Sequence, residues 1–391
     1  MSRLASVLAL LTLFGMAACA TPRGAPGALA DIRAGQRPAA DTDEAGLWMQ
    51  MDRVEQTLRT SGHLVTDPEV RGYLRDMVCK LAPEHCADIR LYVVQTPHFN
   101  ASMAPNGTMQ VWTGLLLRAD NEAQLAYVPG HELGHYLRRH SVQRWRDVRM
   151  KTSVASVFTV LTAAAGQGYI GSLAQLAALG SILQFSRDNE READDIGVEL
   201  MVRAAYDPRE APKIWEALDK ERRAAKDSEP LVFFATHPPT DERIETLKEL
   251  ARKTYAQDRD WTDGRQAYLA AIRPLRARLL RDELRLRDFA RTQVLLERLL
   301  TAEPVSGELH FFRGELYRLR NDEGDPARAL ASYERALALG SAPPEANRAA
   351  GLLLMRQGQK AQARAAFDRY LTEAPEAEDK PMIQSYLEQL R

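Results

Sequence analysis

The segment His131-Glu132-Leu133-Gly134-His135 lies in a stretch, residues 121–145, whose apolar residues follow a helical pattern. Residues four apart share one face of a helix, so the imidazoles of His131 and His135 can reach one metal ion. Glu132 stands beside them and can take a proton from water at that ion. The chain has eight His, and chance gives this pattern about once in a hundred such sequences. The segment therefore predicts a catalytic metal site with Glu132 as general base.

The third ligand is not another histidine of the same segment. A long H-E-x-x-H-x-x-G-x-x-H motif needs Gly at position 138 and His at position 141, where this chain has Arg138 and Ser141. His140 is one residue out of place. This subclass is excluded, and a carboxylate from a later helix is the alternative.

A later helical segment, residues 186–194, offers that carboxylate. Glu190 and Asp194 are four apart and share a face, so Glu190 can bind the metal while Asp194 accepts the free N–H of a ligand histidine. Glu192 points roughly 200° around the helix from Glu190, and we expect it to be solvated or salt-bridged. Two His and one carboxylate leave a fourth position for water, the layout of a catalytic zinc site. We expect one Zn²⁺ per chain.

The segments around this motif predict the fold class. Residues 47–81 have a helical pattern, and residues 89–94 and 109–113 have strand composition. We expect an α+β domain over residues 46–255, mostly helical with a small sheet. The strand at 109–113 is predicted to pair with an extended substrate.

The last third of the chain contains an internal repeat. Residues 329–337 recur as residues 363–371, an offset of 34 that is the tetratricopeptide period. We therefore predict an all-α, tetratricopeptide-like repeat domain over residues 256–391. Such arrays form concave surfaces that hold peptides or partner proteins. The alternative is a plain helical tail that braces the enzyme.

The first residues indicate export. A short positive start is followed by an apolar run, residues 4–18, too short to span a membrane comfortably. We predict a signal peptide over residues 1–19 and a flexible linker over residues 20–45. Residues 16–19 resemble a lipobox, which would make Cys19 the lipidated first residue. The alternative is an A-x-A cleavage site at residues 18–20.

Export bears on the two remaining cysteines, Cys79 and Cys86. An exported pair this close favours a disulfide, and the alternative is two unpaired core residues. Residues 152–186 contain no charged residue, which suggests either a membrane-contacting hairpin or a pair of buried helices. Interrupting glycines favour burial. The net charge of −1 provides no field to gather nucleic acid, so we expect no nucleic-acid partner.

The motifs together resemble the gluzincin metallopeptidases of the HtpX, LoiP and BepA kind. The resemblance covers residues 47–250 and rests on the zinc helix and four further segments: N-A-x-x-x-P-x-G at 100–107, G-L-L at 114–116, E-x-x-A-D at 190–194 and H-P-x-x-x-x-R at 237–243. With the repeats behind it, the architecture is most similar to BepA-type periplasmic proteases. The resemblance implies that Glu190 is the third ligand.

The family also implies an activity and a location. The implied activity is hydrolysis of peptide bonds in unfolded, misfolded or stalled envelope proteins. The repeats would dock on outer-membrane assembly machinery. The protein would be periplasmic and anchored to the outer membrane through Cys19. The resemblance further implies that His237 reaches the active site. It could fill the fourth zinc position as a latch, which we favour, or donate to the oxyanion. The alternative is a loop residue that packs or bonds only locally.

One feature departs from the family pattern. Pro129-Gly130 precedes His131 where small or aliphatic residues are usual, and proline within a helix costs about 3 kcal/mol and favours a kink. This departure favours a second reading, a repeat-based chaperone or adaptor with a latent protease domain. A third reading is a non-catalytic zinc-stabilised scaffold, which requires a permanently filled fourth position.

Overall fold

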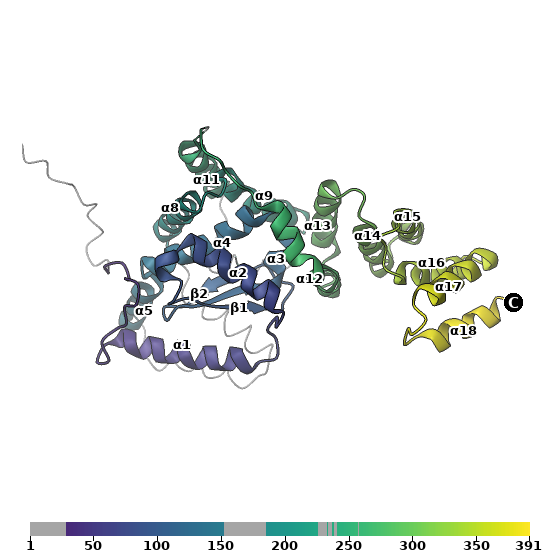
Figure 1. Ribbon diagram of the computed structural model, residues 1–391, viewed down its shortest axis with the longest axis horizontal. Coiled ribbons are helices and arrows are strands. Elements are labelled where there is room, and N and C mark those ends of the chain that lie inside the picture. The colour runs from purple at the N-terminus through teal and green to yellow at the C-terminus, as the bar shows by residue number, and fades with distance from the viewer. Residues whose placement is uncertain (1–28, 152–184, 226–232, 234–236, 238–240, 257) are drawn as a thin grey trace, which may run out of the picture.

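The computed structural model describes residues 29–151, 185–225, 233, 237, 241–256 and 258–391. The predicted signal peptide with Cys19, and all but the last two residues of the uncharged segment 152–186, lie outside the described residues. The predicted fold class is confirmed: a mostly helical unit with a three-stranded sheet is followed by an array of helices that extends away from it (Figure 1). Within the described ranges, no helix combines the length and apolarity needed to cross a membrane.

The helical pattern predicted over 47–81 forms two helices, α1 (Asp43–Thr60) and α2 (Pro68–Leu81). The break follows from the sequence between them. Gly62 adopts a positive φ of 71°, and the Asp67 side chain caps α2 by accepting from the backbone N–H groups of residues 69 and 70. Proline at the first helical position suits such a start.

The predicted linker, residues 20–45, differs from the structure where it is described. Ile32 is buried in the core and its N–H donates to the Leu137 carbonyl at 3.0 Å. Asp31 pairs with Arg138 at 2.8 Å, and α1 already begins at Asp43. The composition of this segment has no apolar period, but the buried Ile32, its backbone hydrogen bond and the Asp31–Arg138 pair hold it against the folded domain.

The sheet has the order β1-β3-β2, formed by β1 (Arg90–Val94), β2 (Ala101–Met103) and β3 (Thr108–Trp112). β1 is parallel to β3, and β2 is antiparallel to it. Because β3 has a neighbour on each side, the prediction that the strand near 109–113 pairs with substrate is wrong. A turn at Gly107, with φ 89°, folds β2 back onto β3, so that β2 becomes the edge strand.

Helices enclose the sheet, with α1 on one side and α2 and α4 on the other (Figure 1). The remaining elements of this unit are η1 (Pro83–His85), α3 (Thr113–Arg118), α4 (Glu122–Leu137), α5 (His140–Lys151), α8 (Arg187–Arg203), η3 (Pro208–Glu210), α9 (Ala211–Ala224) and α11 (Asp241–Thr254). Every residue of α4 from Ala123 to Tyr136 is buried. A helix that is buried all round must present its polar side chains to an internal site.

Glycines set the distance between α4 and α8. A Cβ added at Gly134 would lie 2.9 Å from the Ala193 backbone, and one at Gly197 would lie 3.0 Å from the His131 nitrogen. The two backbones can approach this closely only without those side chains. The close approach brings the carboxylates of α8 beside the histidines of α4.

The C-terminal array comprises α12 (Arg265–Arg285), α13 (Phe289–Ala302), α14 (Gly307–Arg320), α15 (Asp325–Ala338), α16 (Glu345–Arg356), α17 (Lys360–Glu373) and α18 (Lys380–Gln389). The repeat seen in the sequence has a packing counterpart. A Cβ at Gly314 would lie 2.3 Å from the Tyr333 ring, and one at Gly351 would lie 2.7 Å from the Phe367 ring. The pairs α14–α15 and α16–α17 thus each place an aromatic side chain over a glycine of the first helix.

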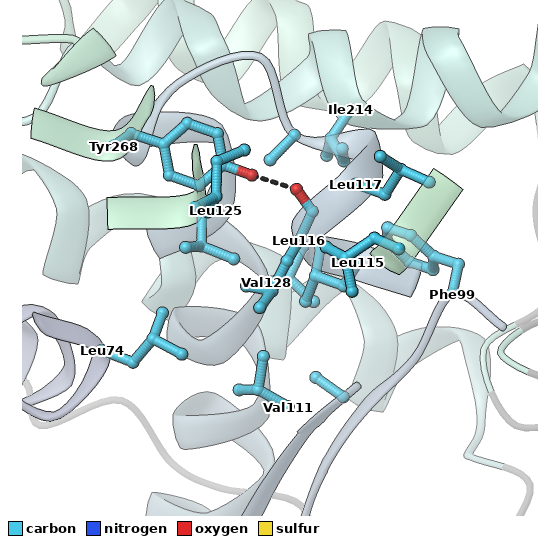
Figure 2. Packing of buried hydrophobic residues seen from close by; sticks show 14 of the residues in the cluster. Leu74, Phe99, Val111, Leu115, Leu116, Leu117, Leu125, Val128, Ile214 and Tyr268 are labelled. Atoms are coloured by element: carbon cyan, nitrogen blue, oxygen red, sulfur yellow. Dashed lines mark hydrogen bonds between the residues drawn. The ribbon is translucent and has the colours of Figure 1, made fainter. Parts of the chain in front are cut away.

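The predicted domain boundary at 255/256 falls between α11 and α12, yet α12 packs into the core of the sheet-containing unit. Figure 2 shows Leu116 of α3 and Tyr268 of α12 in one cluster, joined by a hydrogen bond from the Tyr268 hydroxyl to the Leu116 carbonyl. Buried Arg118 pairs with Glu221 of α9 at 2.8 Å and with Glu283 of α12 at 2.9 Å. The array is therefore continuous with the first unit.

Candidate metal centre

Four side chains converge between α4, α8 and the segment that carries His237. Their ligand atoms, one each from His131, His135, Glu190 and His237, lie within 4.8 Å of one another, and all four residues are buried. The two α4 histidines are one turn apart and therefore share a face of the helix. That face packs against α8. Glu190 lies in the first turn of α8, whose start is fixed by the Ser186 capping box.

Carboxylates fix the proton on each α4 histidine. His131 Nδ1 lies 2.9 Å from Asp194 Oδ1, and an ionised carboxylate can only accept, so Nδ1 carries the proton and Nε2 the lone pair. This is the role that the sequence predicts for Asp194. Burial would raise the pKa of Asp194, but the charge of Arg243 and the hydrogen bond from His131 outweigh it and hold that pKa well below its usual range.

A chain of two hydrogen bonds, from Glu192 through His140, places the proton on His135 in the same way. His140 Nε2 lies 3.1 Å from Glu192 Oε2, and His140 Nδ1 lies 3.0 Å from His135 Nδ1. If His140 donates to the carboxylate, its other nitrogen accepts from His135, whose Nε2 then carries a lone pair. Glu192 also pairs with Arg138 at 3.0 Å, in line with a salt-bridged side chain. The role of His140 was not predicted from the sequence, where it stands out only as a histidine one residue from the position that the long motif requires.

The donor set fits a small tetrahedral cation. The Nε2 atoms of His131 and His135 lie 3.1 Å apart, and oxygens of Glu190 lie 3.4 Å from His135 Nε2 and 3.6 Å from His131 Nε2. Ligands at about 2.0–2.1 Å from a tetrahedral zinc ion lie about 3.3 Å from one another. Facing lone pairs repel in the absence of a cation. Burial also lowers the pKa of both histidines, which favours the neutral form that binds metal.

Glu132 borders this cluster without joining it. It is buried, and burial, reinforced by the charge of Glu190, raises its pKa to about 7. The backbone N–H of Met103, on the edge strand β2, hydrogen-bonds to its carboxylate. A carboxylate with a pKa near neutrality beside a metal site has the properties of a general base.

The His237 ring lies among the ligands. Its Nδ1 is 3.0 Å from Glu190 Oε1 and 3.3 Å from His131 Nε2, while its Nε2 is 3.4 Å from Glu132 Oε1. The ring of Phe233 stacks on it at 4.4 Å. Burial alone would lower the pKa of His237, but the carboxylates of Glu190 and Glu132 outweigh it and raise that pKa.

Arg243 is a member of the site that the sequence analysis did not assign. Its guanidinium lies 2.8 Å from Glu190 Oε2 and donates to both oxygens of Asp194 at 2.7 and 2.8 Å. Its cation also lies 4.6 Å from the centre of the Trp215 ring. The Arg243 guanidinium therefore orients both Glu190, the predicted metal ligand, and Asp194, the partner of His131. The sequence feature that could have identified Arg243 is its position as the last residue of the H-P-x-x-x-x-R segment at 237–243.

Pro129 does not displace the ligands. α4 continues through Pro129 and Gly130, and the two histidines one turn further on face Glu190. A Cβ at Gly130 would lie 3.3 Å from the Gly197 carbonyl oxygen, so this glycine also serves the close contact with α8.

Comparison with known proteins identifies this arrangement. Residues 65–251, which contain the whole cluster, match Peptidase family M48. The chain carries a peptidase family M48 domain. Residues 320–388 match the Tetratricopeptide repeat. The predicted resemblance and the predicted helical repeats are thus confirmed.

Relatives of the M48 domain occur in bacteria and mitochondria. The chain is 28% identical over 226 residues to the Beta-barrel assembly-enhancing protease of Escherichia coli, covering 55% of this chain and 46% of that protein. It is 35% identical over 160 residues to Mitochondrial metalloendopeptidase OMA1 of Schizosaccharomyces pombe, covering 41% of this chain and 45% of that protein. The chain thus spans less than half the length of these relatives.

Proposed function

We propose that this protein is a zinc-dependent endopeptidase that hydrolyses unfolded or misfolded envelope proteins. The observation that carries the proposal is the cluster of His131, His135 and Glu190 with Glu132 beside it. The M48 match supports peptidase chemistry, and the relatives named as beta-barrel assembly-enhancing proteases support a role in protein quality control of the envelope.

The chain's own residues divide the work of hydrolysis. Bound zinc would supply Lewis-acid chemistry, polarising a peptide carbonyl and activating water. Glu132 accepts the proton of the attacking water and passes it to the leaving amine, a transfer suited to a pKa near 7. Arg243 and Asp194 keep Glu190 and His131 in place during the reaction.

The edge strand β2 is the element that suits an extended substrate. Residues 100, 102 and 104 face β3, because the carbonyl of Asn100 and the N–H of Ala104 bond to it. The intervening Ala101 and Met103 therefore direct their main-chain groups to the edge that no described strand covers, on the side where Met103 meets Glu132. Pairing there holds the substrate backbone beside the general base with little sequence preference.

His237 would restrain the enzyme as a latch. Its Nδ1 lies within 3.3 Å of a ligand atom of both His131 and Glu190, so it stands where a fourth metal ligand would stand. A metal with all four positions filled by protein has no place for water. Release of His237 would open the fourth position.

The same contact favours a second candidate function, a chaperone or adaptor that works through its repeats while the peptidase site stays closed. The repeat match supports protein–protein contacts in either case. A scaffold whose metal is permanently four-coordinate would be the limiting form of this candidate.

Location and partner belong to the same proposal. The protein would be exported to the periplasm, anchored to the outer membrane through lipidated Cys19, and docked by its repeats on outer-membrane assembly machinery. The supports are the leader and lipobox in the sequence and the printed names of the bacterial relatives. Fractionation of cells with labelled fatty acid tests it, since Cys19→Ala should abolish labelling and release the protein from the membrane.

Casein cleavage tests the peptidase proposal. Glu132→Gln should retain its metal and lose activity by about 10²-fold or more, and a chelator should abolish activity of the parent protein. Glu199→Gln, an exposed carboxylate on the same helix as Glu190, is the matched control and should cleave normally. Undiminished cleavage by Glu132→Gln would exclude the proposed base. Retained partner binding with no cleavage by the parent protein would favour the chaperone.

A further inference from the structure

The repeat domain contains a pocket of about 430 Å³ that shares no residue with the metal centre. Its walls come from α12, α14 and α16, the first helix of three successive helix pairs. This volume lies in the range of pockets that hold a ligand.

An apolar floor lies at the centre of the pocket. Phe311 and Phe312 of α14 form it with Leu284 of α12, and Leu319 extends it by two turns. The two aromatic rings are held at 5.2 Å from each other in an edge-on arrangement. A floor of this kind accepts an apolar side chain of a ligand.

Arginines surround this floor. Arg281 and Arg285 lie one turn apart on α12, Arg287 follows the end of that helix, and Arg348 lies across the pocket on α16. Arg281 and Arg285 have side chains 50% and 75% exposed. Arg281 is 3.9 Å from Glu345, beyond hydrogen-bond distance, and Arg287 packs against the Phe289 ring, so both retain N–H donors for a ligand.

The two carboxylates of the pocket, Glu315 and Glu345, do not neutralise the positive charge of the four arginines. Glu315 already accepts hydrogen bonds from the Arg318 guanidinium and the Tyr333 hydroxyl.

Two rim arginines do have acidic partners. Arg285 pairs with Asp282 and Arg348 with Asp379, each at 2.6 Å. Arg285 is largely exposed, so its ion pair stabilises little and an incoming carboxylate can replace it. Arg348 is half-buried and can share its charge with a ligand while it keeps Asp379.

The lining thus carries four guanidinium groups and two carboxylates. Arg281 and Arg287 have no hydrogen-bonded acidic partner among the described residues, and Glu315 is already bonded.

We propose that this pocket binds an acidic peptide segment, with an apolar side chain on the Phe311–Phe312 floor and flanking Asp or Glu side chains on the rim arginines. Arginine forks match carboxylates in bidentate geometry, and clusters of arginine are a recurring mode of acidic-motif recognition. A peptide presents apolar and anionic side chains along one short backbone, which fits a floor between two charged walls. An anionic membrane keeps its apolar acyl chains beneath a continuous layer of headgroups, so it does not present one apolar group between two carboxylates.

A peptide-binding assay with the full chain tests this inference. The probe is a short fluorescent peptide rich in Asp and Glu with a central Phe, and the Glu132→Gln background keeps it intact. Arg281→Glu combined with Arg285→Glu should weaken binding about tenfold or more. Arg252→Glu combined with Arg364→Glu, two exposed arginines outside the pocket, makes the same change in net charge and should have little effect.

Three outcomes would overturn the proposal: equal loss of binding in both double variants, equal binding of the matching Asn and Gln peptide, or binding of phosphatidylglycerol vesicles but not of the peptide. If the pocket variant does not fold by circular dichroism, Arg281→Gln with Arg285→Gln replaces it. This assay reads binding alone, so its failure leaves the proposed peptidase activity unaffected.

Discussion

Each α4 histidine of the metal centre is oriented by a carboxylate that does not itself bind the metal. Asp194 holds His131 directly, and Glu192 holds His135 through His140. Glu190 differs from both, because its oxygens face the two histidine lone pairs. The three carboxylates lie on one helix yet have different roles, which depend on the partner that each one meets.

This division predicts different metal contents for two matched variants. Glu190→Gln removes a ligand charge and should strip most of the metal, whereas Glu192→Gln loosens an orienting contact one residue further out and should weaken binding by about tenfold, the low end for such contacts. Metal analysis of the purified variants, after dialysis against zinc buffered at micromolar concentration, measures this. Loss of metal in Glu192→Gln with retention in Glu190→Gln would reverse the assignment.

For His237, we predict that replacement by Ala raises basal casein cleavage, because the fourth position becomes free for water. The metal content should stay the same, since three ligands remain. If His237 instead donates to the oxyanion, cleavage should fall by about 10²-fold at unchanged metal content. Activity equal to that of the parent would assign His237 a structural role.

The residues of the α4 motif could be predicted because a spacing of four fixes their relation within one helix. Arg243 could not be assigned a role, since its contacts with Glu190 and Asp194 are made only by the packing of α11 against α8. The role of His140 in orienting His135 could not be predicted for a related reason. Its function depends on Glu192, 52 residues away, and no local pattern links the two.

At the scale of elements, the α4–α8 contact determines the geometry of the metal centre. Gly134→Ala places a Cβ 2.9 Å from the Ala193 backbone, so the helices must separate. We expect a loss of about 1–3 kcal/mol in unfolding free energy together with weaker metal binding. Gly72→Ala in α2 meets nothing within 4 Å and is the matched control; it should stabilise by about 0.5–1 kcal/mol. Thermal unfolding with and without zinc measures both effects, and equal behaviour of the two variants would refute the role of the contact.

Helix α1 is tied to the sheet by Glu55, which accepts from Arg90, Tyr92 and Thr108. The hydrogen bond from Arg90 is the largest cause that lowers the pKa of Glu55 to about 2. A carboxyl with a lowered pKa stabilises the fold above its unfolded value, 4.5, and this stability is lost as pH falls towards 2.

Glu55→Gln should therefore cost about 2 kcal/mol at neutral pH, a figure reduced because Arg90 is partly exposed. The variant and the parent protein should converge in stability as the pH approaches 2. Urea unfolding at a series of pH values tests this, and a constant difference across that range would contradict it.

The strands show what a sequence reveals about elements. Residues 89–94 and 109–113 could be predicted as strands from their β-branched and aromatic composition. Their order in the sheet could not, because β2 is three residues long and has no pattern of its own. Its antiparallel pairing with β3 places it at the edge.

Across the whole molecule, α12 joins the M48 domain to the repeats. The buried group of Arg118, Glu221 and Glu283 connects α3, α9 and α12, and removal of one partner would leave an unpaired buried charge. The internal repeat predicts a separate helical domain after residue 255, whereas α12 packs against α3 of the first unit. The interface itself depends on contacts between residues more than 100 positions apart, which composition does not record.

We propose that the whole chain holds one catalytic zinc ion through nitrogen and oxygen ligands. The most direct measurement is elemental analysis of the purified full-length protein, combined with X-ray absorption at the zinc edge and a parallel casein assay. We predict one zinc per chain with no sulfur neighbour, since Cys79 and Cys86 form a disulfide. Chelation should remove metal and activity together, and one equivalent of zinc should restore both. Full cleavage by metal-free protein, or zinc bound by sulfur, would contradict the account.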